Sequence, residues 1–136
     1  MTRKLLVIDD DGAVGEFARH LGQQAGFDVH LVTDSHQAAA EFVAFRPELV
    51  LLDLVMPGVD GIVVLDAILT SGIPAEIVLT VGADAGDGYA RIAAGVTRYH
   101  GLPPLSVLRK PFRRQELLQV LGRITAPIEP STSLAV

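Results

Sequence analysis

Five short apolar runs, spaced along the whole chain, constrain the fold more than any other feature of the sequence. They lie at residues 5–8, 29–32, 49–52, 77–79 and 105–108. Each has the length of a strand. Most lack the alternation of apolar and polar residues that is typical of a strand with one solvent-exposed face. Such runs are typical of a parallel sheet that is covered on both faces.

The segments between these runs carry apolar residues at a spacing of three or four, which is typical of amphipathic helices. The stripes begin at Val14, Ala38, Ile62, Tyr89 and Leu117. Strand and helix therefore alternate along the chain, which predicts an open α/β fold with right-handed crossovers. We expect a five-stranded, doubly wound parallel sheet of flavodoxin-like order 2-1-3-4-5, with helices on both faces.

The length of 136 residues suits a single domain with a substantial core. We predict that this domain covers residues 1–126. The last residues, 127–136, begin Pro-Ile-Glu-Pro-Ser-Thr. This segment is predicted to be a flexible C-terminal tail and not a second domain.

The composition excludes several classes of protein. The chain has no cysteine, which excludes disulfides, thiolate catalysis and cysteine-ligated zinc. No apolar run approaches the ~20 residues that span a bilayer, and the apolar run at the start is too short for a signal peptide. We therefore expect a cytoplasmic protein with no membrane insertion.

The charge pattern argues against a nucleic-acid-binding surface. The net charge is −5, and the basic residues are scattered except for Arg109, Lys110, Arg113 and Arg114. A nucleic-acid surface usually shows a basic stripe. We expect no direct binding of DNA or RNA, and a monomer or weak homodimer.

Polar side chains stand where the predicted strands end, which is where doubly wound sheets collect their function. Asp9 and Asp10 follow the first strand, Asp53 follows the third, Thr80 the fourth and Lys110 the fifth. Strands one and three are neighbours in the predicted order, so their carboxylates should lie within a few ångströms. Crowded carboxylates repel one another unless a cation is present. A site of oxygen ligands without His or Cys suits Mg²⁺.

A lysine, a hydroxyl and Mg²⁺ around one strand-end carboxylate form an arrangement for phosphoryl transfer. The metal and the Lys110 ammonium would neutralise charge on the phosphoryl oxygens, and the Thr80 hydroxyl would donate a hydrogen bond. Asp53 would be the nucleophile and would form an aspartyl phosphate.

Together these residues resemble the receiver domain of bacterial response regulators in two-component systems, of the chemotaxis-regulator type. The resemblance rests on residues 8–11 (Ile-Asp-Asp-Asp), 51–58 (Leu-Leu-Asp-Leu-Val-Met-Pro-Gly), 60–61 (Asp-Gly), Thr80 and 110–112 (Lys-Pro-Phe). It runs from about residue 4 to residue 124. No single motif is specific, but the five occur in the right order on the right strand ends.

The resemblance implies a phosphoacceptor and a metal site. Asp53 would accept a phosphoryl group from a phosphohistidine on a sensor histidine kinase or a histidine phosphotransfer protein. Asp10 and Asp53 would bind Mg²⁺ together with the backbone carbonyl of Val55, and Asp9 would act mainly through water.

It also implies how the signal leaves the site. Lys110 would pair with the phosphoryl group, and its peptide bond to Pro111 would be cis. Thr80 would move toward the phosphate. An unidentified output protein would then bind the face formed by the fourth helix, the fifth strand and the fifth helix. The chain would catalyse only its own phosphorylation and dephosphorylation, and so would not be an enzyme acting on external substrates.

Three positions depart from the family pattern. Val81 follows Thr80 where alanine or glycine is usual, and we expect its branched side chain to narrow access to the phosphorylation pocket. The connection to the fifth strand is longer than usual, with residues 96–104 inserted. Val107 stands where an aromatic switch residue is usual, so we expect an unconventional output.

Two other classes of function compete with this one. A phosphatase or phosphotransferase with an aspartyl nucleophile generally needs a second acid two residues later, as the general acid and base. Val55 stands there, which argues against turnover of an external substrate. A flavin-binding, flavodoxin-like carrier would need a Ser/Thr/Gly-rich phosphate loop after the first strand, where this chain has acids that would repel the flavin phosphate.

The remaining polar residues receive simpler interpretations. Asp11 is expected to be a solvated residue that favours the start of a helix. The four histidines, His20, His30, His36 and His100, fall on different elements and are expected on the surface and not as metal ligands.

Overall fold

The computed structural model describes residues 2–125, and within them strands and helices alternate as expected. In chain order these are β1 (Arg3–Ile8), α1 (Gly12–Gln24), β2 (Phe27–Val32), α2 (Ala38–Phe45), β3 (Leu49–Asp53), α3 (Gly61–Thr70), β4 (Glu76–Val81), α4 (Gly88–Tyr99), β5 (Ser106–Arg109) and α5 (Arg114–Thr125). Two short 3₁₀ turns, η1 (Ser35–Gln37) and η2 (Ala83–Ala85), precede α2 and α4. The predicted tail, residues 127–136, lies outside the described residues, so its boundary stays a prediction.

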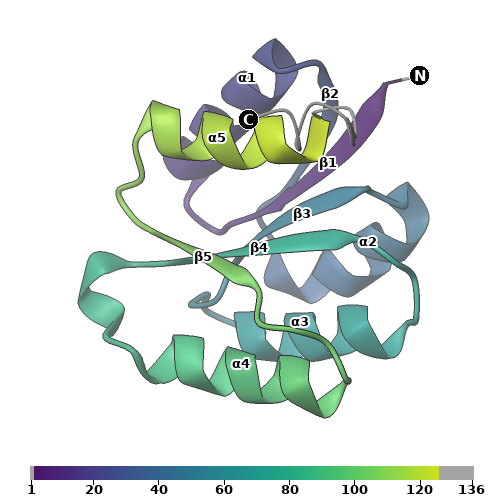
Figure 1. Cartoon of the computed structure of the whole chain (residues 1–136), viewed down its shortest axis with the longest axis vertical. Coiled ribbons are helices and arrows are strands. Elements are labelled where there is room, and N and C mark those ends of the chain that lie inside the picture. The colour runs from purple at the N-terminus through teal and green to yellow at the C-terminus, as the bar shows by residue number, and fades with distance from the viewer. Residues whose placement is uncertain (1, 126–136) are drawn as a thin grey trace, which may run out of the picture.

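The sheet confirms the predicted fold class. All four strand pairs are parallel, and the order is β2-β1-β3-β4-β5. Figure 1 shows α1 and α5 on one face of the sheet and α2, α3 and α4 on the other. The central strand β3 is buried over its whole length, as its unbroken apolar sequence predicted.

Two hydrophobic clusters separate along the faces of the sheet. Alternate strand residues such as Leu6 and Val50 pack under α2, α3 and α4, while Leu5 and Leu49 pack under α1 and α5. Each of these side chains is at most 1% exposed, and burying such a side chain contributes about 1.5–3 kcal/mol. The two clusters hold the strands in one register, and that register places the strand ends side by side.

Some apolar residues of the helical stripes lie at the margin of the core. Phe17, Val43 and Ile92 are 40%, 47% and 55% exposed. Periodicity located the helices correctly, but it does not show how wide the buried part of each helix face is. No helix in the described part of the chain is both long enough and apolar enough to cross a membrane.

The structure corrects the interpretation of residues 96–104 as an inserted connection. Helix α4 continues to Tyr99, so residues 96–99 are its last turn and only residues 100–105 connect it to β5. Thr97 fills a buried position on this turn, and its hydroxyl donates to the carbonyl of Ala93 at 2.7 Å. Gly101 follows the helix with a φ of +77°, as expected for a glycine beyond the C-cap.

Candidate phosphorylation and metal site

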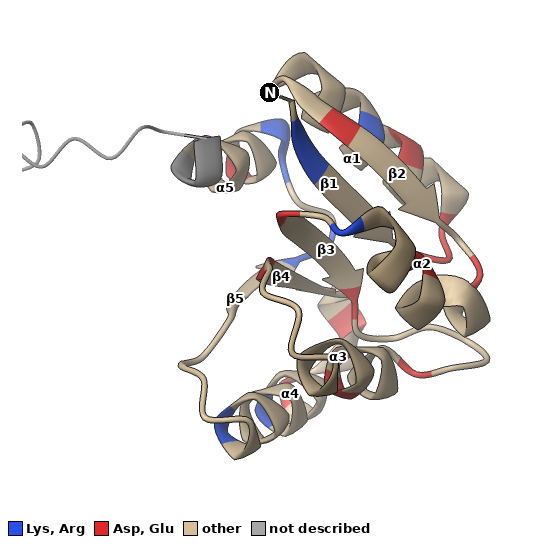
Figure 2. Cartoon of the chain, turned by 90° about the vertical axis from the view of Figure 1, so that its right-hand side faces the viewer, with Lys and Arg blue, Asp and Glu red and all other residues tan. Residues whose placement is uncertain are grey.

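The predicted site residues converge at the carboxyl edge of the sheet. Asp9 follows β1, Asp53 ends β3, and Thr80 pairs with Asp53 in the register of β3 and β4. Lys110 follows β5, where its N–H donates to the carbonyl of Val81 at 2.7 Å. Figure 2 shows acidic residues at the end of β3 and in the neighbouring loops, at this same edge of the molecule.

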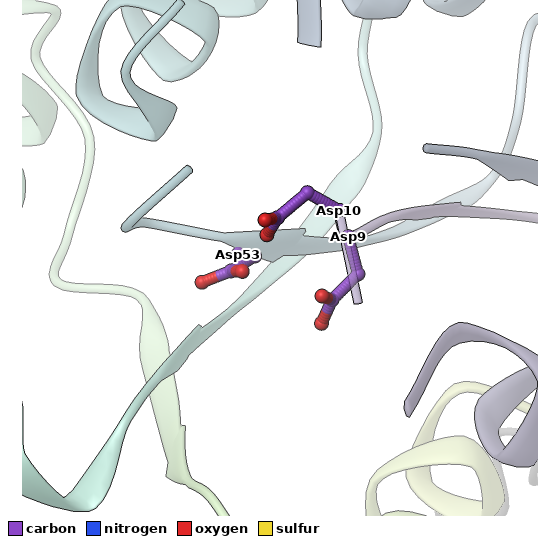
Figure 3. A group of neighbouring side chains, drawn as sticks. All are labelled: Asp9, Asp10 and Asp53. Carbon is purple, nitrogen blue, oxygen red and sulfur yellow. The ribbon is translucent and has the colours of Figure 1, made fainter. Parts of the chain in front are cut away.

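Three carboxylates meet at this edge in an arrangement that could hold a metal ion. One oxygen each of Asp9, Asp10 and Asp53 can be chosen so that all three lie within 4.8 Å of one another (Figure 3). Asp9 and Asp53 are each 3% exposed, whereas Asp10 is exposed to solvent. A site with only oxygen ligands and one open side fits a hard divalent cation that keeps several waters, as Mg²⁺ does.

Lys110 neutralises part of this charge. Its Nζ lies 2.7 Å from Asp9 Oδ2 and 3.1 Å from Asp53 Oδ2. Partial burial lowers the pKa of the Lys110 ammonium, but the hydrogen bond and charge of Asp9, together with those of Asp53, outweigh it and leave the pKa raised. Lys110 is therefore protonated at neutral pH and available to an anionic group.

Some neighbours of Asp53 stabilise its charged form and others destabilise it. Its Oδ1 accepts a hydrogen bond from the Val55 N–H at 3.1 Å. Burial, and to a smaller extent repulsion by Asp9, raise the pKa of Asp53 to about 6, although the Val55 N–H and Lys110 act in the opposite direction. The fold thus tolerates a charge on Asp53 only at a cost in stability.

This raised pKa predicts a pH dependence of stability in the metal-free protein. The Asp53 pKa rises from 3.8 to about 6, so the native state binds this proton more tightly than the unfolded state. The free energy of unfolding should therefore fall as pH rises from about 4 to about 6. The size should be on the order of 2–3 kcal/mol, at about 1.4 kcal/mol for each pKa unit. Urea unfolding in the presence of a chelator would measure it.

The control for this pH dependence is a pair of variants. Asp53→Asn should flatten the profile between these pH values, because it removes the titrating carboxyl. Asp60→Asn should leave it unchanged, because Asp60 caps α3 by accepting from the Ile62 N–H at 2.9 Å, and asparagine caps equally well. An identical slope in the wild-type and Asp53→Asn proteins would contradict the raised pKa.

The buried hydroxyl of Thr80 also belongs to this site. Among the described residues, Thr80 Oγ1 is the buried side-chain polar atom without a hydrogen bond, and Thr80 is 1% exposed. Leaving such a group unpaired costs about 1–3 kcal/mol. Because Thr80 and Asp53 are register partners, their side chains project from the same face, and an oxygen bound to Asp53 could accept from this hydroxyl.

Solvent reaches the site through an open cavity of about 460 Å³. Its wall includes Asp10, Asp53 and Lys110, together with residues 82–85 after β4. Val81 does not line this cavity: it is fully buried in the cluster under α2, α3 and α4. The expectation that Val81 narrows the entrance was wrong, because successive strand residues alternate between faces and Val81 points opposite to Thr80.

Comparison with known protein families agrees with this geometry. The model of the response regulator receiver domain matches residues 5–122. This chain belongs to the response regulator receiver family. The family assignment confirms the resemblance and the two-component class of function, and it removes the flavin carrier as an alternative.

The relatives of this receiver are longer proteins. It is 34% identical over 142 residues to the DNA-binding response regulator MtrA of Mycobacterium tuberculosis (strain ATCC 25618 / H37Rv). The alignment covers 100% of this chain and 57% of MtrA. The receiver is 33% identical over 140 residues to the response regulator MprA of Mycobacterium bovis (strain BCG / Pasteur 1173P2), again with 100% and 57% coverage. The receiver thus spans little more than half the length of these relatives.

Solved structures resemble the receiver over most of its length. The chemotaxis protein CheY4 of Vibrio cholerae superposes with a TM-score of 0.75 at 22% identity, covering 91% of this chain and 99% of that one. The receiver domain of NtrX from Brucella abortus superposes with a TM-score of 0.72 at 25% identity, covering 88% and 96%. These similarities support the fold.

Asp11 and three of the histidines have structural roles in the receiver. Asp11 caps α1, because its Oδ1 accepts from the N–H groups of Ala13 and Val14, which agrees with its expected place at the helix start. Three histidines lie outside the acidic cluster and pair with single carboxylates, as His30–Glu41, His36–Asp34 and His100–Asp66.

Sequence reasoning missed one residue that touches the site's supporting loop. The hydroxyl of Ser35 donates to the Pro57 carbonyl and accepts from the Val59 N–H, each at 2.9 Å. No spacing or motif connects Ser35 with residues more than twenty positions away. A serine directly after an acid and before a helix indicates only a local cap.

Proposed function

We propose that this receiver accepts a phosphoryl group on Asp53 in the presence of Mg²⁺ and signals by binding another protein. The donor is a phosphohistidine of a sensor histidine kinase or a histidine phosphotransfer protein. The observation that carries this proposal is the convergence of a carboxylate, an ammonium and an unpaired hydroxyl, on Asp53, Lys110 and Thr80. Each of the three would contact a different part of the same phosphoryl group.

The carboxylates of Asp10 and Asp53 and the backbone carbonyl of Val55 would hold the metal. Asp9 would act through water, because its Oδ2 already binds Lys110 Nζ and its Oδ1 accepts the Asp11 N–H at 2.9 Å. When bound, Mg²⁺ supplies positive charge that neutralises the phosphoryl oxygens.

The transfer itself exchanges one bond to phosphorus for another. An Asp53 carboxylate oxygen forms the bond to phosphorus while the bond from phosphorus to the histidine nitrogen breaks, and the imidazole leaves with that electron pair. Lys110 exchanges its contact with Asp53 for one with a phosphoryl oxygen, and Thr80 Oγ1 donates to another. Lys110 already contacts Asp53 before the reaction, so its ammonium needs little reorganisation, whereas Thr80 moves toward the phosphoryl group.

Incubation with MgCl₂ and acetyl phosphate tests the proposal. The protein should gain one phosphoryl group by intact mass, and mild base should remove it, as expected of an acyl phosphate. A chelator should prevent the gain. Absence of any mass gain from acetyl phosphate and from a panel of phosphorylated histidine phosphotransfer proteins would contradict the proposal.

The output is expected to run through the segment after Thr80. Val107 is 38% exposed on β5 and carries no ring, so an aromatic flip is not available. We propose that residues 81–104 respond instead, and that the output protein binds the adjoining face of α4, β5 and α5. A switch needs an element with two arrangements that the phosphate biases.

Hydrogen exchange with and without beryllofluoride, a phosphoryl analogue, measures this response. Amide protection should change mainly at residues 81–104, and Thr80→Ala should remove most of that change while beryllofluoride still binds. Thr70→Ala, on the exposed end of α3, is the control and should respond like the wild type. A change confined to residues 54–60 would place the output on another face.

The same geometry disfavours action on external substrates. Val55 occupies the place of a second acid, and its N–H is engaged with Asp53. The relative MtrA is a DNA-binding response regulator, but this chain spans about 57% of its length. We propose that this chain acts in the cytoplasm, as a monomer or weak homodimer, and makes no direct contact with nucleic acid.

A further inference from the structure

The loop between β3 and α3 is fixed at both of its ends. At its start, the Leu54 N–H donates to the Thr80 carbonyl at 2.9 Å. At its end, the Gly61 N–H donates to the Leu54 carbonyl at 3.2 Å, and Gly61 lies so close to the backbone of residues 53 and 54 that no side chain would fit there. These contacts fix the two ends of the loop but do not hold its middle, residues 57–59.

Ser35 provides that hold. Its hydroxyl donates to the Pro57 carbonyl at 2.9 Å and accepts from the Val59 N–H at 2.9 Å. Ser35 is 6% exposed, so water competes poorly for either bond. In the part of the chain that the structure describes, these are the hydrogen bonds that join residues 57–59 to the rest of the molecule.

The neighbours of Ser35 keep its hydroxyl in place. Asp34 caps the 3₁₀ turn η1 by accepting the His36 N–H at 3.0 Å, which fixes the backbone on either side of Ser35. The His36 ring covers the loop at Gly58, where a Cβ would lie 2.7 Å from His36 Cε1. Gly58 also has a φ of +84°, so only glycine meets both demands.

We propose that Ser35 is a positioning residue for the metal and phosphoryl chemistry at Asp53, an inference that rests on the proposed function. Val55 stands two residues before Pro57. Its N–H holds Asp53 Oδ1, and its carbonyl is the proposed backbone ligand of the metal. By fixing the Pro57 carbonyl and the Val59 N–H, Ser35 sets the path of the loop and with it the direction of both groups of Val55.

Loss of a group that orients a metal ligand typically weakens metal binding by about 10–100-fold. Ser35→Ala should therefore weaken Mg²⁺ binding about tenfold, measured by following the Val55 amide in an NMR titration with MgCl₂ alone. Ser35→Cys is a second variant of nearly the same size. It should give a smaller loss of the same kind, since a thiol is a weak donor and acceptor, and it serves if Ser35→Ala does not fold.

Ser71 offers a matched control. Its hydroxyl also bridges a carbonyl and an N–H, donating to Ile68 at 2.6 Å and accepting from Ile73 at 3.2 Å. It lies at the other end of α3, away from Asp53. Ser71→Ala should lower the melting temperature as Ser35→Ala does, but the dissociation constant for Mg²⁺ should stay at the wild-type value.

The outcomes separate the two proposals. Weaker Mg²⁺ binding in the Ser35 variants alone supports the positioning role. A wild-type dissociation constant in both Ser35 variants, or equal weakening in Ser71→Ala, overturns it and leaves the proposed function standing. If the wild-type protein shows no saturable shift at Val55 with MgCl₂, the metal site itself fails and the proposed function falls with the inference.

Discussion

Replacing Asp53 by asparagine is expected to abolish phosphoryl incorporation completely. The substitution keeps the size and shape of the side chain but removes the carboxylate oxygen that would attack phosphorus, and an amide is a very poor nucleophile. Asp9 makes similar contacts with Lys110 Nζ and with the Asp11 N–H, but Asp53 is the acid that pairs with Thr80 in the register of β3 and β4. Intact mass after incubation with MgCl₂ and acetyl phosphate measures the loss.

Asp60→Asn is the control for this experiment, because it makes the same chemical change at the other end of the loop that follows Asp53. Asp60 accepts from the Ile62 N–H as the cap of α3, so the variant should fold and gain one phosphoryl group as the wild type does. Full incorporation in Asp53→Asn would place the phosphoacceptor elsewhere, and Asp9 or Asp10 would then be the first acids to test.

Replacing Lys110 by methionine is expected to slow phosphorylation by about 10²–10³-fold, the usual cost of removing one preorganised donor from a site of developing charge. The affinity for Mg²⁺ should instead increase. Lys110 Nζ contacts both Asp9 and Asp53, so its loss leaves the carboxylates without a competing cation and should tighten the metal. Phosphorylation kinetics and an MgCl₂ titration of the same variant separate the two effects.

Arg109→Met is the matched control for Lys110→Met. It removes a positive charge one residue away, but Arg109 forms an exposed salt bridge with Asp87, and such surface pairs contribute little. The variant should phosphorylate at close to the wild-type rate. Equal slowing in both variants would mean that overall charge, and not the contact of Lys110 with Asp53, accounts for the effect.

Much of the site could be predicted before the structure was known, and the reason is topological. Parallel strands end at the same edge of a sheet, so a polar residue directly after an apolar run must lie at that edge. Asp9, Asp53 and Lys110 are such residues, and Thr80 is the second-to-last residue of β4. Once the strand order was inferred, their proximity followed.

The predictions that failed concern the direction of a side chain and the length of a helix. Val81 stands next to Thr80 in the sequence, yet its side chain enters the opposite core, because neighbouring strand residues face opposite ways. Residues 96–99, expected within the lengthened connection to the fifth strand, instead form the last turn of α4, where Thr97 is buried. Local sequence is weakest at the ends of elements, where such packing decides the boundary.

The sequence alone determined the alternation of strands and helices, the parallel sheet and the set of residues at its carboxyl edge, because periodicity and apolar runs encode burial directly. Tertiary structure decided which atoms meet. It paired Lys110 with Asp9 as well as Asp53, left Thr80 Oγ1 without a hydrogen-bond partner among residues 2–125, and placed Ser35 against residues 57–59. These contacts join segments far apart in the chain, and their distances depend on how all the helices pack on the sheet.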